Sequence, residues 1–495
     1  MTNNIAATFK TISTSKQTEN GANAFSTTDD ACLDLFSTIG ALRNGGDYQS
    51  RLYDMIHKAY TEDPLLLAKI LFYARDIRGG LGERQVFRCA LHYCADKYPS
   101  IIKANIELIP EYGRWDDLLC LIDTYLEKAM WSILAKQFAK DEQALKEGSS
   151  NISLLAKWMP SADTSSADTR ALAFKCADAL GMTVYEYKRR VRALRKQLNL
   201  LETSMSSKRW GEIDYATIPS QAHARHIKAF HRNDTGRYNQ YLQEVSAGKK
   251  SIKTSTLYPY EIVERLSKND EFNKSYELMW KNLPDYITDK DVNIMIMADT
   301  SGSMMGRPMN TATSLAMYFA ERNNGPFKNL YMTFESTPRL ISIDPSESLG
   351  KRYYDLMRGP WGGSTNLEGA FDLLLKVAIV TNAKPEDMPK SIIVITDMEI
   401  NPVSGNTREW ETIVDVMQKR FSDAGYELPN LIFWNVASRQ NTFLSKSRYK
   451  GVQMVSGSSP SVFKSLIGSF NGMTPMDCLR QTVDVERYSA IKLVE

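Results

Sequence analysis

The sequence predicts an α-helical repeat domain of the HEAT type followed by an α/β doubly wound domain. Apolar residues recur at helical spacing from Asp29 to about Pro284, with short polar or glycine-containing connections between the helices. From about Asp291, strands alternate with helices, as is typical of a mostly parallel sheet covered by helices. The 495 residues also exceed one ordinary core. We therefore expect a flexible arm over residues 1–24, a helical domain over 25–285 and an α/β domain over 286–495.

The composition indicates a soluble globular protein, with 43% hydrophobic and 24% charged residues. No run of about 18 apolar residues predicts a membrane span, and the polar start of the chain lacks the apolar core of a signal peptide. The six cysteines are scattered, which favours reduced thiols and a cytoplasmic location. A net charge of +3 does not itself predict nucleic-acid binding, so local charge has to decide that question.

The helical half begins after a Thr-, Ser-, Asn- and Gln-rich arm that we expect to be mobile or loosely docked. Paired helices without strands indicate an α-solenoid of the HEAT or armadillo kind, although an irregular helical bundle explains the pattern equally well. The expected helices cover residues 30–42, 51–59, 64–75, 85–98, 101–109, 115–129, 131–146 and 154–158.

One loop in this half combines three glycines with three arginines, in the stretch ARDIRGGLGER. Glycines allow the backbone to approach a ligand closely, and the guanidinium groups of Arg75, Arg78 and Arg84 suit phosphate. The alternative is a tight turn at a helix end, with the arginines paired to Asp76 and Glu83.

The segment 186–232 is the most basic in the chain, with eleven Lys or Arg against four acids, a local balance of 11 − 4 = +7. Basic groups interleaved with aromatics such as Tyr187, Trp210 and Tyr215 suit phosphate contacts and base stacking on RNA. The alternative is a solvated helix face, with the aromatics in the core. The candidate phosphate contacts are Lys188, Arg189, Arg190, Arg192, Arg195, Lys196, Lys208, Arg209, Arg225, Lys228 and Arg232.

The second half is predicted to be a doubly wound sheet. Its first strand, residues 292–298, is apolar along nearly its whole length, as expected of a strand buried on both faces. Further strands are expected at 330–334, 340–343, 391–396, 430–436 and 452–455, and helices at 310–322, 346–357, 367–380, 408–424, 461–470 and 475–482.

Oxygen-bearing side chains follow three of these elements. Asp299, Ser301 and Ser303 leave the first strand in DTSGS, Thr365 precedes a helix in GGSTN, and Asp397 ends the strand at 391–396. Because parallel strands bring such loops to one edge of the sheet, these side chains should converge. Hydroxyls and carboxylates favour a hard divalent cation, Mg²⁺ or Mn²⁺, with one position open to an outside carboxylate.

These three loops resemble the metal-ion-dependent adhesion site of the von Willebrand factor A domain. The stretches TENGANAF, ARDIRGGLGER, LETSMSSKRWGEIDYATIPSQA and LYPYEIV resemble the DUF2828 family. That family is similar to the Ro 60-kDa autoantigen, in which a helical-repeat TROVE module precedes a von Willebrand A domain. Ro proteins form a ring of helical repeats that binds misfolded and small structured RNAs. The resemblance therefore implies a similar RNA surface around residues 188–232.

The leading hypothesis is a non-enzymatic, Ro-type RNA-binding scaffold with a divalent-metal site. The alternative is a metal-dependent adaptor without an RNA role, in which a partner protein supplies an acidic residue to the metal. A metal-activated water for phosphoryl chemistry is a third possibility, but no general base is evident beside Asp299 and Asp397, although Glu399 lies close in sequence. The RNA, the metal, the oligomeric state and closure of the helices into a ring are not determined by the sequence.

Overall fold

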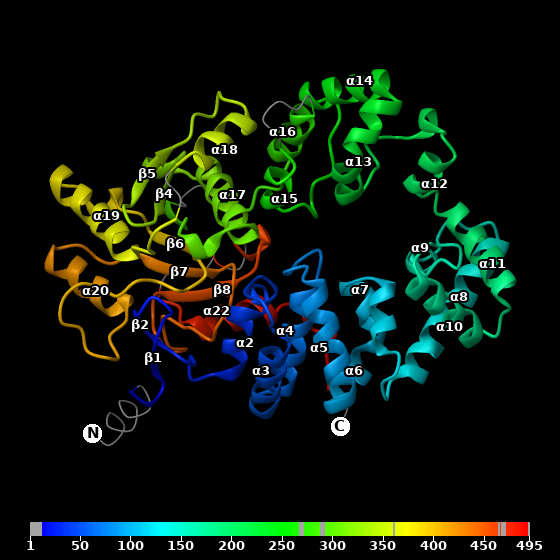
Figure 1. Ribbon diagram of the computed structural model, residues 1–495, viewed down its shortest axis with the longest axis horizontal. Helices are drawn as coiled ribbons and strands as arrows, with labels where there is room; N and C mark the ends of the chain where they lie inside the picture. Colours follow the sequence, from blue (N-terminus) through cyan, green and yellow to red (C-terminus); the bar gives the residue numbers. More distant parts are fainter. Residues whose placement is uncertain are drawn as a thin grey trace.

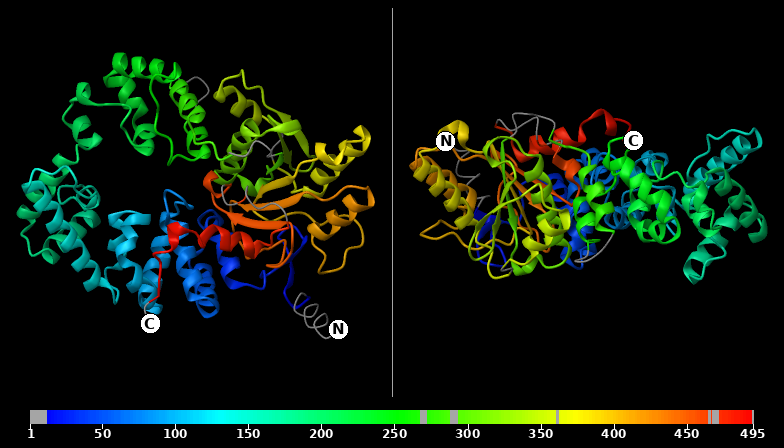
Figure 2. Two further views of the ribbon diagram at one scale, coloured as in Figure 1. Left: turned by 180° about the vertical axis from the view of Figure 1, so that it is seen from behind. Right: turned by 90° about the horizontal axis from the view of Figure 1, so that it is seen from above.

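A computed structural model describes residues 12–266, 272–287, 293–359, 362–463, 466 and 472–493. The helical half leaves the sheet domain, follows an arc and returns to the opposite side of the same domain, so the chain traces a ring (Figure 1). Figure 2 shows this arc from behind and edge-on. The order of a helical domain followed by an α/β domain is confirmed.

The helical half consists of helices whose apolar side chains are buried against neighbouring helices. The predicted helix 64–75 is found with the same bounds, starting at the N-cap Asp63 and Pro64. The predicted helix 115–129 is wrong: a 3₁₀ segment, η3 (Trp115–Leu121), occupies its first part, and Asp123 with φ +63° interrupts the helix before Glu127. No helix in the described part of the chain is long and apolar enough to cross a membrane. The helices are α2 (Ala31–Ile39), α3 (Gln49–Glu62), α4 (Pro64–Arg75), α5 (Arg84–Lys97), α6 (Pro99–Asn105), α7 (Ile109–Tyr112), α8 (Glu127–Lys146), α9 (Leu155–Trp158), α10 (Ala167–Ala179), α11 (Val184–Gln197), α12 (Leu201–Ser206), α13 (Ser220–Asn233), α14 (Thr235–Ser246), α15 (Pro259–Val263) and α16 (Asn273–Lys281).

In the part of the chain that the structure describes, the sheet domain has six strands in the order β5-β4-β3-β6-β7-β8, and only the β4–β5 pair is antiparallel. Strands β3 and β6 are buried along their whole length. The strands are β3 (Ile294–Asp299), β4 (Leu330–Phe334), β5 (Arg339–Ser342), β6 (Ser391–Thr396), β7 (Asn430–Asn435) and β8 (Val452–Ser456). The helices are α17 (Arg307–Arg322), α18 (Leu349–Met357), α19 (Leu367–Thr381), α20 (Ile413–Asp423) and α22 (Pro475–Val483). The predicted start of the first strand at Val292 and most of the predicted helix 461–470 lie outside the described residues.

Both ends of the helical arc pack on the sheet domain. At one end α2 lies against β8, where a Cβ on Gly40 would stand 2.8 Å from the Cα of Gly457, so glycine permits the contact. At the other end α15 packs on α17. The two ends also touch directly, because the Tyr258 hydroxyl donates to the Leu81 carbonyl at 2.9 Å. The ring is therefore closed through bonds within the helical half as well as through the sheet.

The N-terminal end of the helical half contacts the sheet domain, and the C-terminal end of the sheet domain contacts the helical half. Strands β1 (Ser15–Gln17) and β2 (Asn23–Phe25) form a hairpin, and Phe25 exchanges two backbone hydrogen bonds with Phe443 of the sheet domain. The prediction of a loosely docked arm is therefore wrong for the described residues from Ser15 onward. In the reverse direction, Arg487 forms an ion pair with Asp76 of the helical half.

Candidate metal centre and basic helices

The candidate metal ligands lie at the carboxyl edge of the sheet. Asp299 is the last residue of β3, and Asp397 follows the last residue of β6. Because β3 and β6 are parallel neighbours, with Ala298 in register with Ile395, the two aspartates leave the sheet side by side. Thr365 lies just before α19, in the loop that reaches the same edge.

Hydrogen bonds connect the three loops. Within the first loop, the Ser301 amide donates to Asp299 Oδ1 at 2.9 Å, and the hydroxyls of Ser301 and Ser303 lie 3.1 Å apart. The second loop is attached to the third by two reciprocal bonds: the Thr365 amide donates to Asn401 Oδ1 at 3.1 Å, and the Asn401 amide donates to the Thr365 carbonyl at 3.0 Å. The five side chains are thus presented by loops whose backbones are fixed relative to one another.

The electrostatics of this edge favour a positive charge beside the two aspartates. Asp299 and Asp397 are fully buried, and burial together with the charge of Asp397 raises the pKa of Asp299 to about 7. Asp299 Oδ2 accepts a hydrogen bond from the Thr396 hydroxyl at 2.6 Å. Asp397 Oδ2, in contrast, has no hydrogen-bond partner among the residues that the structure describes, and its ion-pair contact with Arg439 Nη2 is long, at 3.7 Å. A buried carboxylate oxygen without a partner is costly unless a cation neutralises it.

The donor set fits a hard divalent cation of the Mg²⁺ or Mn²⁺ type. Two carboxylates and three hydroxyls offer only oxygen, the ligand type these ions prefer. Among the described residues there is no group of three or more His, Cys, Asp or Glu side chains that could hold a metal, so any ion here depends on the hydroxyls. The residues that would hold it are Asp299, Ser301, Ser303, Thr365 and Asp397.

The N-terminal arm covers this edge, which the sequence did not predict. The Thr18 hydroxyl donates to the Ile400 carbonyl at 2.7 Å, and the Glu19 amide donates to Glu399 Oε2 at 2.6 Å. Asn20 Nδ2 lies 3.3 Å from the hydroxyl of the candidate ligand Thr365. The stretch TENGANAF was recognisable in the sequence only as a motif of the family. Its polar residues do not indicate that it docks on a loop some 380 residues later in the chain.

The glycine–arginine loop has a structural role at the ring closure. Arg75 is only 2% exposed, and its Nε lies 2.7 Å from Asp117, so its guanidinium is not at the surface. Arg78 is exposed and donates to the Glu111 carbonyl at 2.8 Å, and Arg84 is also exposed. The Cβ of a residue at position 82 would meet the Tyr258 hydroxyl at 2.2 Å, so the close approach that requires this glycine is made by the protein itself.

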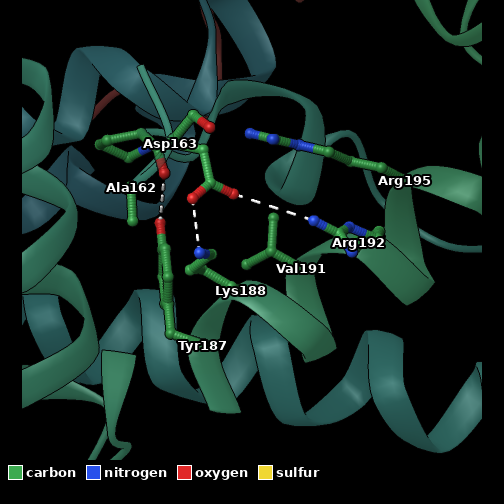
Figure 3. Close-up of a pocket in the computed structure, with 9 residues that line it drawn as sticks. Ala162, Asp163, Tyr187, Lys188, Val191, Arg192 and Arg195 are labelled. Carbon is green, nitrogen blue, oxygen red and sulfur yellow. Dashed lines mark hydrogen bonds and ion pairs between the residues drawn. The ribbon is translucent and has the colours of Figure 1, made fainter. Parts of the chain in front are cut away.

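Part of the predicted basic surface is engaged in internal contacts. Arg190 forms an ion pair with Glu142, and Arg195 donates to the carbonyls of Ala156 and Met159 at 2.8 and 2.6 Å. Figure 3 shows the carboxylate of Asp163 pointing toward Lys188 and Arg192. All three residues line a cavity of about 130 Å³. Lys188 Nζ lies 2.5 Å from this carboxylate, whereas Arg192 lies 3.8 Å away and remains mostly exposed. Three of the α11 cations predicted to contact RNA, Lys188, Arg190 and Arg195, thus already have close internal partners.

The other basic residues form two regular stripes. Three exposed cations on α11 and three on α13 follow the spacing i, i+3, i+7, which places each trio on one helix face. Apart from the long Arg192–Asp163 contact, no carboxylate among the described residues forms an ion pair with either trio. Lys208 and Arg209 lie exposed on the segment between these helices, and Arg209 is paired with Glu212. The stripes are Arg189, Arg192 and Lys196 on α11 and Arg225, Lys228 and Arg232 on α13.

Most of the aromatic and histidine side chains in this segment belong to the core. Tyr187 and Tyr215 are buried, and their hydroxyls donate to the Pro160 carbonyl and to Asp234, each at 2.7 Å. His223 is fully buried beside the Tyr238 hydroxyl, and burial lowers its pKa to about 3. Of the three aromatic residues proposed to stack on RNA bases, only Trp210 is partly exposed and thus accessible to a base.

Comparison with known proteins gives the following similarities. The model of DUF2828, a domain of unknown function, matches residues 18–133 and 124–290, and that of DUF7788, also of unknown function, matches residues 293–487. A protein of Acanthamoeba polyphaga mimivirus, uncharacterized protein L728, is 30% identical over 499 residues, covering 92% of this chain and 86% of its own. The crystal structure of the Ro protein (RSR) of Deinococcus radiodurans aligns with 89% of this chain and 99% of its own, at 14% identity and a TM-score of 0.48. The match to the DUF2828 model, which extends over more than half of the chain, identifies the chain as a member of the DUF2828 family.

Proposed function

We propose that this chain is a non-enzymatic RNA-binding scaffold whose sheet domain carries a divalent-cation centre. The observation that supports RNA binding best is the pair of cation stripes on α11 and α13. Exposed arginines and lysines at helical spacing, with so few carboxylates beside them, match the repeating negative charge of a nucleic-acid backbone. The closed arc of helices offers one continuous scaffold for both stripes.

Phosphate contacts predict how strongly the affinity for RNA depends on salt concentration. The two stripes with Lys208 and Arg209 supply eight exposed cations. If they neutralise six to eight phosphates of a single strand, at about 0.7 per phosphate, affinity falls by about 300- to 2,000-fold between 50 and 200 mM salt. RNA binding that does not respond to salt would contradict this mechanism.

The test is anisotropy of a fluorescent RNA hairpin with a single-stranded tail, titrated with the full chain at several salt concentrations. Changing Arg225, Lys228 and Arg232 together to glutamine removes one stripe and should lower the salt slope by about 2, at about 0.7 per phosphate on a single strand. Three exposed lysines of the sheet domain form the matched control, since their change to glutamine should leave the slope unaltered. They are Lys328, Lys376 and Lys419. If the two triple variants have equal salt slopes, the stripe on α13 does not contact RNA phosphates.

The cation centre is supported by the unpartnered oxygen of Asp397. A divalent ion there would supply positive charge to two buried aspartates and one coordination position for a further carboxylate. Calorimetric titration of the metal-stripped chain with Mg²⁺ and Mn²⁺ tests the centre. Asp397→Asn preserves the side-chain shape but removes the charge, and it should weaken binding by at least about tenfold. Unchanged affinity would place any bound ion elsewhere.

Binding without catalysis is supported by the state of Glu399, the nearest candidate base. Its Oε2 accepts the Glu19 amide at 2.6 Å and its Oε1 accepts the Thr442 hydroxyl at 2.9 Å. Both oxygens are therefore occupied in holding the arm and a sheet-domain loop. A general base needs an oxygen that can reach a water or substrate. Magnesium-dependent RNA cleavage that is lost in Asp397→Asn would refute this part of the proposal.

The second candidate is a metal-dependent protein adaptor without an RNA role. The low charge of the centre, two carboxylates with three hydroxyls, favours it, because a bound ion would retain attraction for an acidic side chain from outside. The adaptor is favoured if the chain captures a partner protein in the presence of Mg²⁺, if RNase treatment does not reduce this capture, and if Asp397→Asn abolishes it. Co-purification of RNA that is lost in the α13 triple variant favours the scaffold.

A further inference from the structure

The side chain of Glu19 lies at the side of the candidate metal centre covered by the arm. Its Oε2 is 3.8 Å from Arg439 Nη1, and Arg439 Nη2 is in turn 3.7 Å from the unpartnered Asp397 Oδ2. We propose that Glu19 supplies the acidic ligand of this centre in cis, so that a bound divalent ion fastens the N-terminal arm to the sheet domain. This inference rests on the proposed cation centre and names its missing ligand.

The position of Glu19 is fixed by bonds to both neighbouring loops. Its own amide and the hydroxyl of Thr18 are held by the segment that follows Asp397, through Glu399 and Ile400. Asn20 is held by that segment too, since its Nδ2 lies 2.5 Å from the Glu399 carbonyl. The same amide group contacts the hydroxyl of Thr365. The arm is thus bonded to a candidate ligand on one loop and to the residues just beyond a candidate ligand on another.

The charges around Glu19 also indicate a shared cation. Arg439 lies between two carboxylates, Glu19 and Asp397, at distances longer than the 2.7–2.9 Å of a direct charge-assisted hydrogen bond. Its Nη2 donates instead to the Ser303 carbonyl in the first ligand loop. One guanidinium therefore offsets two acids without bonding closely to either. A divalent ion held by the same loops would satisfy both carboxylates more fully than this arginine does.

The consequence is a coupling between the metal and the arm. The hairpin that contains Glu19 leads directly into α2, the first helix of the arc. An ion bound to Glu19 would join the start of the helical half to the carboxyl edge of the sheet. A carboxylate from a partner protein would then have to displace Glu19 before it could reach the ion.

The experiment uses the full chain, stripped of divalent ions, with Mg²⁺ alone as the probe. Glu19→Gln removes the charge but keeps the backbone bonds, and the dissociation constant measured by calorimetry should rise by about tenfold or more. Glu409→Gln is the matched control, because it removes one exposed carboxylate from the same domain and should bind Mg²⁺ as the parent chain does. Glu19→Asp, with a shorter acid, should bind with intermediate affinity.

Hydrogen–deuterium exchange supplies a second readout. Mg²⁺ should slow exchange at residues 15–25 in the parent chain and in Glu409→Gln, but not in Glu19→Gln. If the parent chain binds Mg²⁺ and Glu19→Gln binds it equally well, the cis ligand is refuted while the cation centre stands. Faster exchange of the arm in Mg²⁺ also refutes it, since the arm and the ion would then compete. If the parent chain binds no Mg²⁺ at all, the cation centre itself fails.

Discussion

Acidification from pH 7 to pH 5 is expected to loosen helix α13 through one buried histidine. His223 is fully buried on the face of α13 that packs on α14, and its Nε2 lies 3.0 Å from the Tyr238 hydroxyl. Its Nδ1 has no hydrogen-bond partner within the described ranges of the chain. Burial disfavours the imidazolium and lowers the pKa from 6.5 to about 3.

The sign and size of the effect follow from linkage. Because the folded pKa is depressed, the stabilisation by neutral His223 is complete above pH 6.5 and is lost as the pH falls toward 3. At pH 5, His223 is protonated in the unfolded chain, whose pKa of 6.5 lies about 1.5 units above the pH, but it is still neutral in the folded chain. At 1.36 kcal/mol per unit, this difference lowers the free energy of unfolding by about 2 kcal/mol. This loss should appear first in α13 and its neighbours.

Exchange of the α13 amides at pH 7 and pH 5, corrected for the intrinsic rate, measures the local opening free energy. His223→Gln is the comparison, because glutamine stays neutral at both pH values and can still bond to Tyr238. The parent chain should lose about 2 kcal/mol more than the variant. Burial lowers the pKa of His226 too, but this residue is present in both proteins and cancels in the difference. An equal loss in the two proteins would refute the assignment to His223.

Two further substitutions test the ring closure and the buried ion pairs. Gly82→Ala should destabilise the fold by about 1–3 kcal/mol in urea denaturation, since position 82 has φ +65° and its Cβ meets the Tyr258 hydroxyl. Tyr258→Phe in the same chain should recover part of this loss, and no recovery would mean that the contact is not the cause. Asp117→Ala should cost about 3–5 kcal/mol, because it leaves Arg75 buried without a partner. The exposed Arg78→Ala should cost less than about 1 kcal/mol, and similar losses for both would contradict the role assigned to burial.

The sequence predicted the placement of the candidate metal ligands because their positions depend on local patterns. Apolar strands that end in Asp299 and Asp397 are visible in the chain, and parallel pairing then brings their ends together. Whether an ion binds there stays a prediction. The roles of Glu19 and Arg439 at this centre were not predicted. The two residues are far apart in the sequence, and no local or periodic pattern indicates that they lie close together.

The fate of the basic residues was predictable only in part. Spacing alone separates the stripe Arg225, Lys228 and Arg232 from the buried face of α13. It does not reveal that Arg190 pairs with Glu142 or that Arg195 caps two carbonyls, since those partners lie on other helices. Similarly, the glycines of ARDIRGGLGER did indicate close approach, but the approaching group is Tyr258, 176 residues after Gly82 in the numbering (258 − 82).

The pairing of Asp76 with Arg487 has a consequence for the timing of biosynthesis. The buried Asp76 carboxylate receives its counter-ion from a residue 411 positions later, so the helices around it are made long before the charge that neutralises it. At about 5–20 residues per second, roughly 20–80 s of translation separate the two. During that interval Asp76 would lack the counter-ion that it has in the finished protein, at a stage when incompletely packed chains are prone to aggregate and to bind chaperones.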